Sequence, residues 1–185
     1  MTKKILFIIL TLTILVAVGG VGGYLFTAQK NSKQNKQTEL VLSEKTQVER
    51  KASFYFKTDK QTFTEGESFN LVIMVKAEAQ VIDGAEFLLN YDPSLVKLGE
   101  PIPGTFFSVY PQKKVDNEKG TVKVIALQPP GESESLNEEI MVTLPITVLQ
   151  KGKAVFEFDK SKTHIAGYGG QELLEEAVSL SISII

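Results

Sequence analysis

The sequence predicts an all-β sandwich for the folded part of the chain, residues 53–185. Three observations point to this class. Apolar and polar residues alternate in short runs of strand length, Gly, Pro, Asn and Asp clusters separate these runs, and no amphipathic helical pattern exceeds two turns. A segment of this length can bury a core without cross-links. The chain contains no cysteine, so the fold depends on packing rather than on disulfides.

The run 83–91 contains the clearest strand, because its side chains alternate with the period of two that a half-covered strand shows. It is followed by Asp92-Pro93-Ser94, where proline fixes the backbone and Asp92 is suited to bond the amides ahead of it, so a sharp turn is expected. One alternate set is predicted to face the core and the other to be presented outward, respectively Phe87, Leu89 and Tyr91, and Glu86, Leu88 and Asn90.

Two strands are expected before this run. Phe54 to Phe56 open the domain, and Glu65-Gly66-Glu67 makes a turn before the apolar run 69–75. That run has apolar residues on both alternate sets, which predicts a central strand or one covered on both sides. Its two sets are Phe69, Leu71, Ile73 and Val75 on one face, and Val72 and Met74 on the other.

After the turn at Asp92, residues 101–110 read as an irregular loop whose aromatic residues plug one end of the sandwich. Residues 113–117 and 120–127 form a predicted hairpin, since Gly120 can adopt the left-handed conformation that a tight turn needs. In the second hairpin strand Val122, Val124 and Ala126 point inward, whereas Lys123, Ile125 and Leu127 point outward.

The remaining chain supplies three further strands. Residues 131–139 read as a solvated acidic loop, and the strand that follows bends at Pro145, which must lie at an edge or a bulge because it cannot donate to a ladder. A loop is expected at Gly167–Gly170. The alternate inward positions of the three strands are Ile140, Val142, Leu144, Ile146 and Val148; Ala154, Phe156 and Phe158; and Val178, Leu180, Ile182 and Ile184.

The N-terminal segment, residues 1–26, is predicted to be a membrane anchor. Lys3 and Lys4 precede an uncharged run from Ile5 to Phe26, which spans roughly 33 Å as a helix and matches a bilayer core. The alternative is a cleaved signal peptide, because the residues at 17–19 resemble a processing site. The expectation is therefore a domain held outside the cytoplasm, or a secreted one if cleavage occurs.

Residues 27–52 are rich in Lys, Gln, Asn, Ser and Thr and read as a polar tether, with a reach of roughly 30 Å. The domain that follows is acidic. From Ser53 onward it has twelve lysines, no arginine and nineteen Asp or Glu residues, a net charge of −7. An acidic domain without arginine is a poor binder of phosphate backbones, so nucleic acid is excluded as a partner.

Three segments, taken in order, resemble the cohesin domain of cellulosome scaffold and anchoring proteins over residues 53–185. The segment Gly84-Ala85-Glu86-Phe87 leading to Tyr91-Asp92-Pro93-Ser94-Leu95 is similar to the family's GAxFxLxYDPxxL motif. Val115-Asp116-Asn117 with Gly120-Thr121-Val122, and then Leu144 to Val148 with Gly152, resemble its middle and late strands.

The resemblance implies a nine-stranded jelly-roll sandwich that grips a dockerin module of another secreted protein through one sheet face. Leu88, Ile125 and Leu127 are outward by alternation as well, and apolar positions inside a polar rim are the usual anatomy of an interface. Carried over position by position, the partner-binding residues are Glu86, Leu88, Asn90, Asp116, Lys123, Ile125, Leu127, Gln171 and Glu172.

Catalytic and metal chemistry finds little support. His164, the single histidine, has no nucleophile context, and Glu132, Glu134, Glu138 and Glu139 cluster in one predicted loop rather than facing each other across a substrate. Asp116 begins a sequence like a calcium loop, but Leu127 stands where the bidentate acid is needed. We therefore expect no enzyme and no cofactor in this chain, and calcium on the dockerin partner only.

Two other functions stay open. Sugar-binding modules share the sandwich architecture, so polysaccharide is an alternative ligand. Such sites stack sugars on exposed aromatic rings, and here there is no tryptophan, with only Tyr110 and Tyr168 expected on the surface. A structural envelope protein without a specific ligand is the third class, which a largely polar face without an exposed Leu88 would favour.

Overall fold

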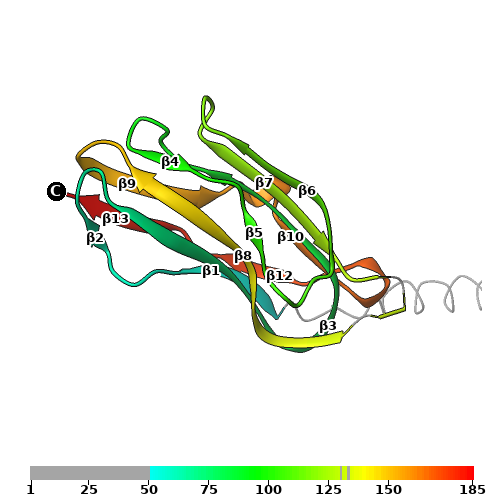
Figure 1. Ribbon diagram of the computed structural model, residues 1–185. Helices are drawn as coiled ribbons and strands as arrows, with labels where there is room; N and C mark the ends of the chain where they lie inside the picture. The colour runs from blue at the N-terminus through cyan, green and yellow to red at the C-terminus, as the bar shows by residue number, and fades with distance from the viewer. Residues whose placement is uncertain (1–50, 130, 133) are drawn as a thin grey trace, which may run out of the picture. The chain divides into compact units, whose positions relative to one another are not determined.

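The computed structural model describes residues 51–129, 131–132 and 134–185, and within them the fold is a β-sandwich, as predicted (Figure 1). The structure divides this part of the chain into thirteen strands where nine were expected, because short edge pairings such as β2, β5 and β11 form separate elements. The strands are β1 (Ala52–Lys57), β2 (Thr62–Phe63), β3 (Ser68–Asn90), β4 (Val96–Leu98), β5 (Ile102–Pro103), β6 (Val109–Asp116), β7 (Thr121–Leu127), β8 (Glu134–Val148), β9 (Gly152–Phe158), β10 (His164–Gly167), β11 (Gln171–Glu172), β12 (Leu174–Ala177) and β13 (Leu180–Ile184), with 3-10 helices η1 (Lys160–Lys162) and η2 (Tyr168–Gly170).

Strand β3 organises the sandwich, because it pairs in both layers (Figure 1). Its first half lies between β1 and β8, and its second half lies between β7 and β10. The sequence predicted two separate strands here, and that prediction was wrong. The ladder with β8 shifts register between Lys76 and Gln80, and Ala79 has a φ of 53°, so the chain changes direction without leaving the sheet.

The core lies between the two layers and is closed by aromatic contacts across them. Phe54 of β1 contacts Phe87 of β3 edge-on, with ring centroids 6.0 Å apart, and stacks on Phe158 of β9 at 5.5 Å. The inward positions predicted for the second half of β3, for β7 and for β9 are buried, which confirms those assignments. They are Phe87, Leu89, Tyr91, Val122, Val124, Ala126, Ala154, Phe156 and Phe158.

Strand β8 differs from its prediction at its first residue and at Ile140. It starts at Glu134, so most of the acidic stretch is strand rather than loop, although its carboxylates remain exposed. A register shift opposite Ile73 and Met74 puts Met141 and Val142 both in the core and leaves Ile140 41% exposed. Ile140 was predicted inward, and the bulge reverses its side.

Pro145 lies where the outer neighbour of β8 changes from β4 to β5. Its carbonyl oxygen accepts a 2.8 Å bond from Gly99 N on that outer side. Because a residue's N and O leave a strand on the same side, the proline nitrogen also points away from β3. No bond of the β3 ladder is lost, which agrees with the predicted edge or bulge position.

The ends of the domain bring smaller corrections. Ala52, predicted as the last linker residue, is the first residue of β1 and is buried, whereas Val178 lies before β13 and is 41% exposed. Gly167 belongs to β10 rather than to the glycine loop. The predicted aromatic plug is present in part: Phe107 is buried, and the Tyr110 hydroxyl donates a 2.7 Å bond to Met141 O.

The predicted anchor and almost all of the predicted tether, residues 1–50, lie outside the described residues. Among the residues that the structure describes, no helix has the length and apolar character needed to cross a membrane.

Candidate partner-binding face

Four strand segments present their outward side chains on one surface: β10, residues 84–90 of β3, β7 and β6, in that order. We call this surface the four-strand face. Residues directly opposite each other in antiparallel strands share a side of the sheet, so the pairing register gives the neighbours on it. Its rows across the strands are Ala166–Gly84–Leu127–Val109, His164–Glu86–Ile125–Gln112, Leu88–Lys123–Lys114 and Asn90–Thr121–Asp116.

The predicted apolar residues of this face, Leu88, Ile125 and Leu127, have side chains that reach the surface, and the exposed Val109 of β6 lies opposite Leu127. Leu88 and Ile125 are half-buried, and Leu127 is 39% exposed. Their inward neighbours are fully buried, so the alternation predicted from the sequence is confirmed in both strands. Leu88 is therefore not sealed beneath the rest of the described domain, which leaves an apolar strip available for contact.

Polar side chains flank the apolar strip on both sides of Leu88 and Ile125. Glu86 lies between Ile125 and His164, and Lys123 lies between Leu88 and Lys114. Asn90 is exposed and lies opposite Thr121 on one side. An apolar centre with a polar rim is the composition of a typical protein interface. The register thus brings these predicted residues onto one surface.

Asp116 lies at the end of β6 and serves the hairpin turn. Its Oδ1 accepts bonds from the backbone N of Lys119 at 3.0 Å and of Glu118 at 3.2 Å, and Lys119 Nζ lies 3.6 Å from Oδ2. The backbone bond from Lys119 is the main cause that holds the pKa of Asp116 below its ordinary value. Its carboxylate is therefore committed to the turn while lying at the edge of the face.

The two predicted residues of β11 lie on opposite sides of the sheet. Glu172 lies opposite Ala166 and so shares the side of the four-strand face, whereas Gln171 lies opposite Gly167 and its exposed side chain leaves the strand on the other side. Eight of the nine predicted positions thus share one side of the sheet by register. Gln171 is the exception.

His164 and Glu172 form a pair at the edge of this face. His164 Nδ1 lies 2.6 Å from Glu172 Oε2, while Glu172 Oε1 accepts backbone bonds from Leu174 N at 2.9 Å and Ile165 N at 3.3 Å. The bond with Glu172 raises the pKa of His164 above its ordinary value. Burial raises the pKa of Glu172, but these hydrogen bonds outweigh burial, and the net shift is downward.

Sequence reasoning assigned His164 no role on this face. A signal was present, since His164 and Ala166 alternate with Ile165 and Gly167 as a strand requires. What the sequence does not contain is the pairing of this short strand with β3, some eighty residues earlier, which places His164 beside Glu86.

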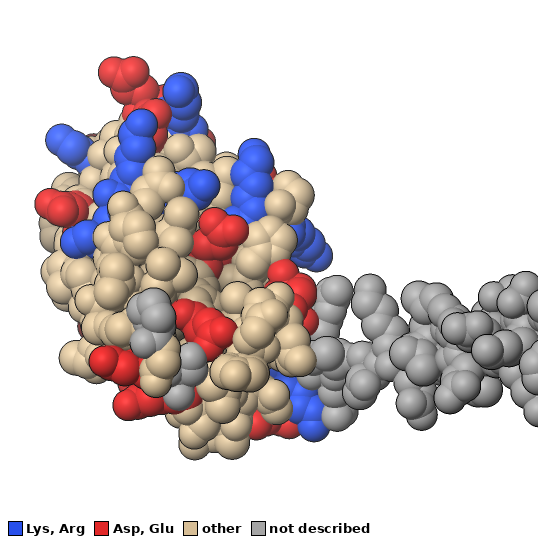
Figure 2. All heavy atoms as spheres, turned by 90° about the vertical axis from the view of Figure 1, so that its right-hand side faces the viewer, with Lys and Arg blue, Asp and Glu red and all other residues tan. Residues whose placement is uncertain are grey.

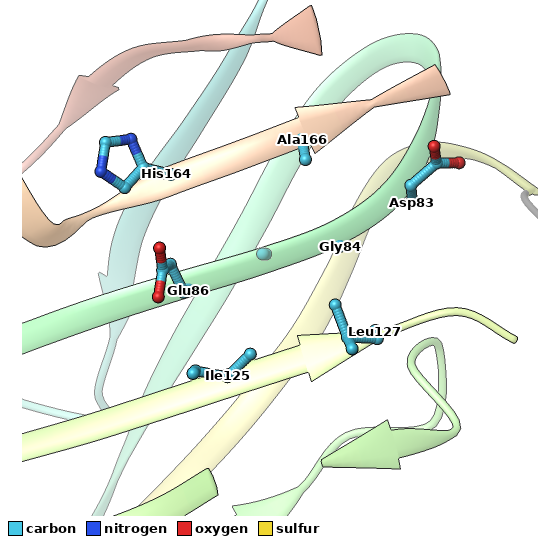
Figure 3. A pocket seen from close by; sticks show the side chains of 8 residues that line it. Asp83, Gly84, Glu86, Ile125, Leu127, His164 and Ala166 are labelled. Atoms are coloured by element: carbon cyan, nitrogen blue, oxygen red, sulfur yellow. The ribbon is translucent and has the colours of Figure 1, made fainter. Parts of the chain in front are cut away.

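A hollow of about 260 Å³ opens in the four-strand face beside this pair (Figure 3). In Figure 3 the side chains of Ala166 and Leu127 point toward each other across Gly84, and Ile125 lies next to Leu127 along β7. The carboxylate of Glu86 lies at one end with His164, and that of Asp83 lies at the other. No local pattern in the sequence marks this hollow, because its lining comes from three strands.

Charge is distributed unevenly over the side of the domain drawn in Figure 2, where lysines gather in the upper half and acidic residues are commoner in the lower half. On the four-strand face, Lys123 and Lys114 stand in one row toward the hairpin turn, whereas Glu86 and Glu172 stand beside the hollow. A partner seated across the face would meet acidic side chains beside the hollow and a row of two lysines before the Asp116 row.

No group of three or more His, Asp or Glu residues in the described part of the chain is close enough to hold a metal ion. The clustered acids of residues 132–139 lie exposed along the start of β8, and Glu138 pairs with Lys57 at 3.3 Å. This placement gives no pair of carboxylates facing each other across a cleft.

The model of the family described as "Cohesin domain" matches residues 54–184. This match extends over the whole sandwich. The chain belongs to the cohesin family. As a cohesin, the domain is a protein-binding module and not an enzyme, as the sequence predicted. A comparison with curated protein sequences found no match.

Solved cohesins share the fold at low sequence identity. The third cohesin of ScaC from Acetivibrio cellulolyticus, in complex with the ScaB dockerin, is 14% identical and covers 72% of this chain and 99% of its own, with a TM-score of 0.62. A type II cohesin from the cellulosome of the same organism is 16% identical, with 71% and 95% covered and a TM-score of 0.61. The cohesin of the Coh-OlpA–Doc918 complex from Clostridium thermocellum is 16% identical, with 72% and 99% covered and a TM-score of 0.59.

Proposed function

We propose that this cohesin captures a dockerin-bearing protein through the four-strand face. The observation that carries the proposal is the half-open apolar strip of Leu88, Ile125 and Leu127 inside a rim of charged and amide side chains. Solved neighbours of similar fold were determined with dockerins bound, which supports a partner of the same class. Calcium belongs to the dockerin in this proposal, and this chain contributes protein contacts only.

The proposal includes anchoring outside the cytoplasm. Its support is the uncharged run from Ile5 to Phe26 after two lysines, followed by a polar segment that reaches roughly 30 Å. An anchor of this kind would hold the captured protein at the cell surface. If the leader is cleaved, the same domain works as a secreted module.

The test is capture from the organism's own secreted proteins on the immobilised full chain in detergent, with calcium or with a chelator. A dockerin module identified by mass spectrometry is then purified and titrated against the full chain by calorimetry. The expected result is a calcium-dependent 1:1 complex. A purified module that fails to bind, or a bound fraction released by soluble polysaccharide, would contradict the proposal.

Polysaccharide binding has less support than protein binding. Of the two tyrosines expected on the surface, Tyr168 is 74% exposed, but Tyr110 is half-buried and packs against the core. Burial raises the pKa of Tyr110 to about 12, in keeping with its enclosed hydroxyl. A single exposed ring does not form the row of aromatic platforms on which sugar chains stack.

A further inference from the structure

The hollow in the four-strand face lies where Gly84 stands between Ala166, which is small, and Leu127, which has a flexible side chain. Gly84 of β3 pairs with Ala166 on one side and with Leu127 on the other, so this row across three strands has no side chain at its centre. A Cβ at Gly84 would lie 2.7 Å from Leu127 Cδ2. The missing side chain lets Leu127 lie over the backbone of Gly84, and the hollow opens beside it between β10, β3 and β7 (Figure 3).

The lining of the hollow suits an aliphatic side chain. Ala166, Leu127 and Ile125 supply apolar walls around its volume of about 260 Å³. An apolar cavity of roughly 150 Å³ is enough to hold benzene, so this space accepts one side chain of leucine or phenylalanine size. Filling it would remove from water the exposed part of Leu127, which favours association.

The rim of the hollow is acidic. The Glu86 carboxylate makes no hydrogen bond or ion pair within the described part of the chain, although it lies beside His164. Asp83 Oδ2 accepts a 3.2 Å bond from Gly169 N. No lysine lines the hollow, and the nearest rim group able to carry a positive charge is His164, which is bonded to Glu172. A cationic neighbour on the partner would therefore meet Glu86 inside the hollow, where no lysine of this chain forms the lining, although Lys123 stands in the next row of the face.

We propose that this hollow receives one aliphatic side chain of the dockerin partner, next to a lysine or arginine that pairs with Glu86. The inference rests on the proposed function and deepens it, because it names what the partner must present. Side chains seated in such central pockets contribute most of the affinity of many interfaces. The small size of Gly84 and Ala166 then decides which dockerins fit.

The test uses the purified, calcium-loaded dockerin module obtained by capture, titrated against variants of the full chain. Ala166→Leu fills the hollow from an outward strand position, so we expect affinity to fall by about 30-fold or more. Ala166→Ser is the matched control, and its affinity should stay within about threefold of the native chain. Thermal unfolding of both variants should match the native protein, because Ala166 faces outward.

The partner side of the contact is tested by a double-mutant cycle. Replacing the aliphatic residue of the module by alanine should weaken binding to the native chain but not to the Ala166→Leu variant. Glu86→Gln should weaken binding about threefold to tenfold, with a smaller dependence on salt than the native chain shows. Additive effects of the two apolar substitutions would overturn the proposal.

The outcomes separate this inference from the proposed function. If Leu88→Asp abolishes binding while Ala166→Leu leaves it unchanged, the face binds the dockerin and the hollow is not used, which overturns the inference alone. If neither substitution weakens binding, or if capture yields no dockerin, the proposed function fails and the inference fails with it.

Discussion

The hydroxyl group of Tyr91 donates a 2.8 Å hydrogen bond to Oδ1 of Asn117, joining the end of β3 to the β6–β7 turn. The same amide closes a pair with Leu98, since its Oδ1 accepts from Leu98 N and its Nδ2 donates to Leu98 O, both at 2.9 Å. Burial, with a smaller contribution from the charge of Asp116, raises the pKa of Tyr91 to about 12. Asn117 therefore fixes the turn of the hairpin that carries half of the four-strand face.

Asn117→Ala should lower the free energy of unfolding by about 2–3 kcal/mol, because it leaves three partly buried groups without their partner. Tyr91→Phe removes a single bond from the same cluster and should cost about 1 kcal/mol. Urea denaturation of the two variants checks this order. Equal losses would mean that the bonds to Leu98 add nothing to stability.

Gly120→Ala should destabilise the domain by about 3 kcal/mol or more. Gly120 has a φ of +65°, and an added Cβ would lie 2.1 Å from Tyr91 O, so the hairpin turn would separate from β3. Gly66→Ala is the matched control, since Gly66 has a φ of +83° with no atom within 4 Å of the added carbon. It should cost only the backbone strain of about 1 kcal/mol, and similar losses in both variants would contradict the steric explanation.

The alternation of apolar and polar residues was sufficient to predict the sides of β3 and β7. Leu88 and Ile125 face outward as expected, because each of these strands has one face in the core and side chains alternate strictly along it. The same rule failed at Ile140. A bulge inserts one residue in the ladder, and nothing in the local pattern of apolar residues marks its position.

The hollow beside Gly84 depended on information that no local pattern contains. Gly84 belongs to a segment that resembles the family motif, and Ala166 lies in a short strand far along the chain. Only the register of β10 against β3 places them side by side. The pairing of two strands so far apart in the sequence depends on the packing of the whole sandwich. For the same reason the sequence assigned His164 of β10 no role on the face.

His164 should titrate with a midpoint above its ordinary value of 6.5, because the hydrogen bond with Glu172 favours the protonated ring. The chain has one histidine, so a single ring signal in a proton NMR titration reports it. Glu172→Gln should move the midpoint downward. A native midpoint at or below 6.5 would mean that the pair does not hold in solution.

The same pair predicts a small change of stability with pH. His164 has a raised pKa in the folded state, so its contribution is complete below about pH 6.5 and is lost as pH rises through the raised pKa. Glu172 has a lowered pKa, so its contribution is present above pH 4.5 and is lost as pH falls. Both side chains are partly exposed, so the effect should stay below about 1 kcal/mol, and His164→Gln should remove the loss on the alkaline side.

Leu88→Asp and Ile125→Asp should each abolish capture of the dockerin module while leaving the thermal unfolding midpoint within about 3 °C of the native value. A carboxylate at the centre of the apolar strip would lose its water when a partner docks, which costs more than the contact returns. Binding measured by calorimetry should weaken by about 100-fold or more. A large loss of thermal stability would instead assign these side chains to the core.

The control for this prediction is Ile102→Asp. Ile102 is 54% exposed on β5, which pairs with β8 rather than with any strand of the four-strand face. The substitution adds the same charge at an apolar position that is more exposed than Leu88 or Ile125, so it matches the change in net charge. Capture by this variant should equal that of the native chain, because only the position of the charge, and not its presence, opposes docking. If all three variants lost capture equally, the cause would be the added negative charge and not its position. The four-strand face would then not be the docking surface.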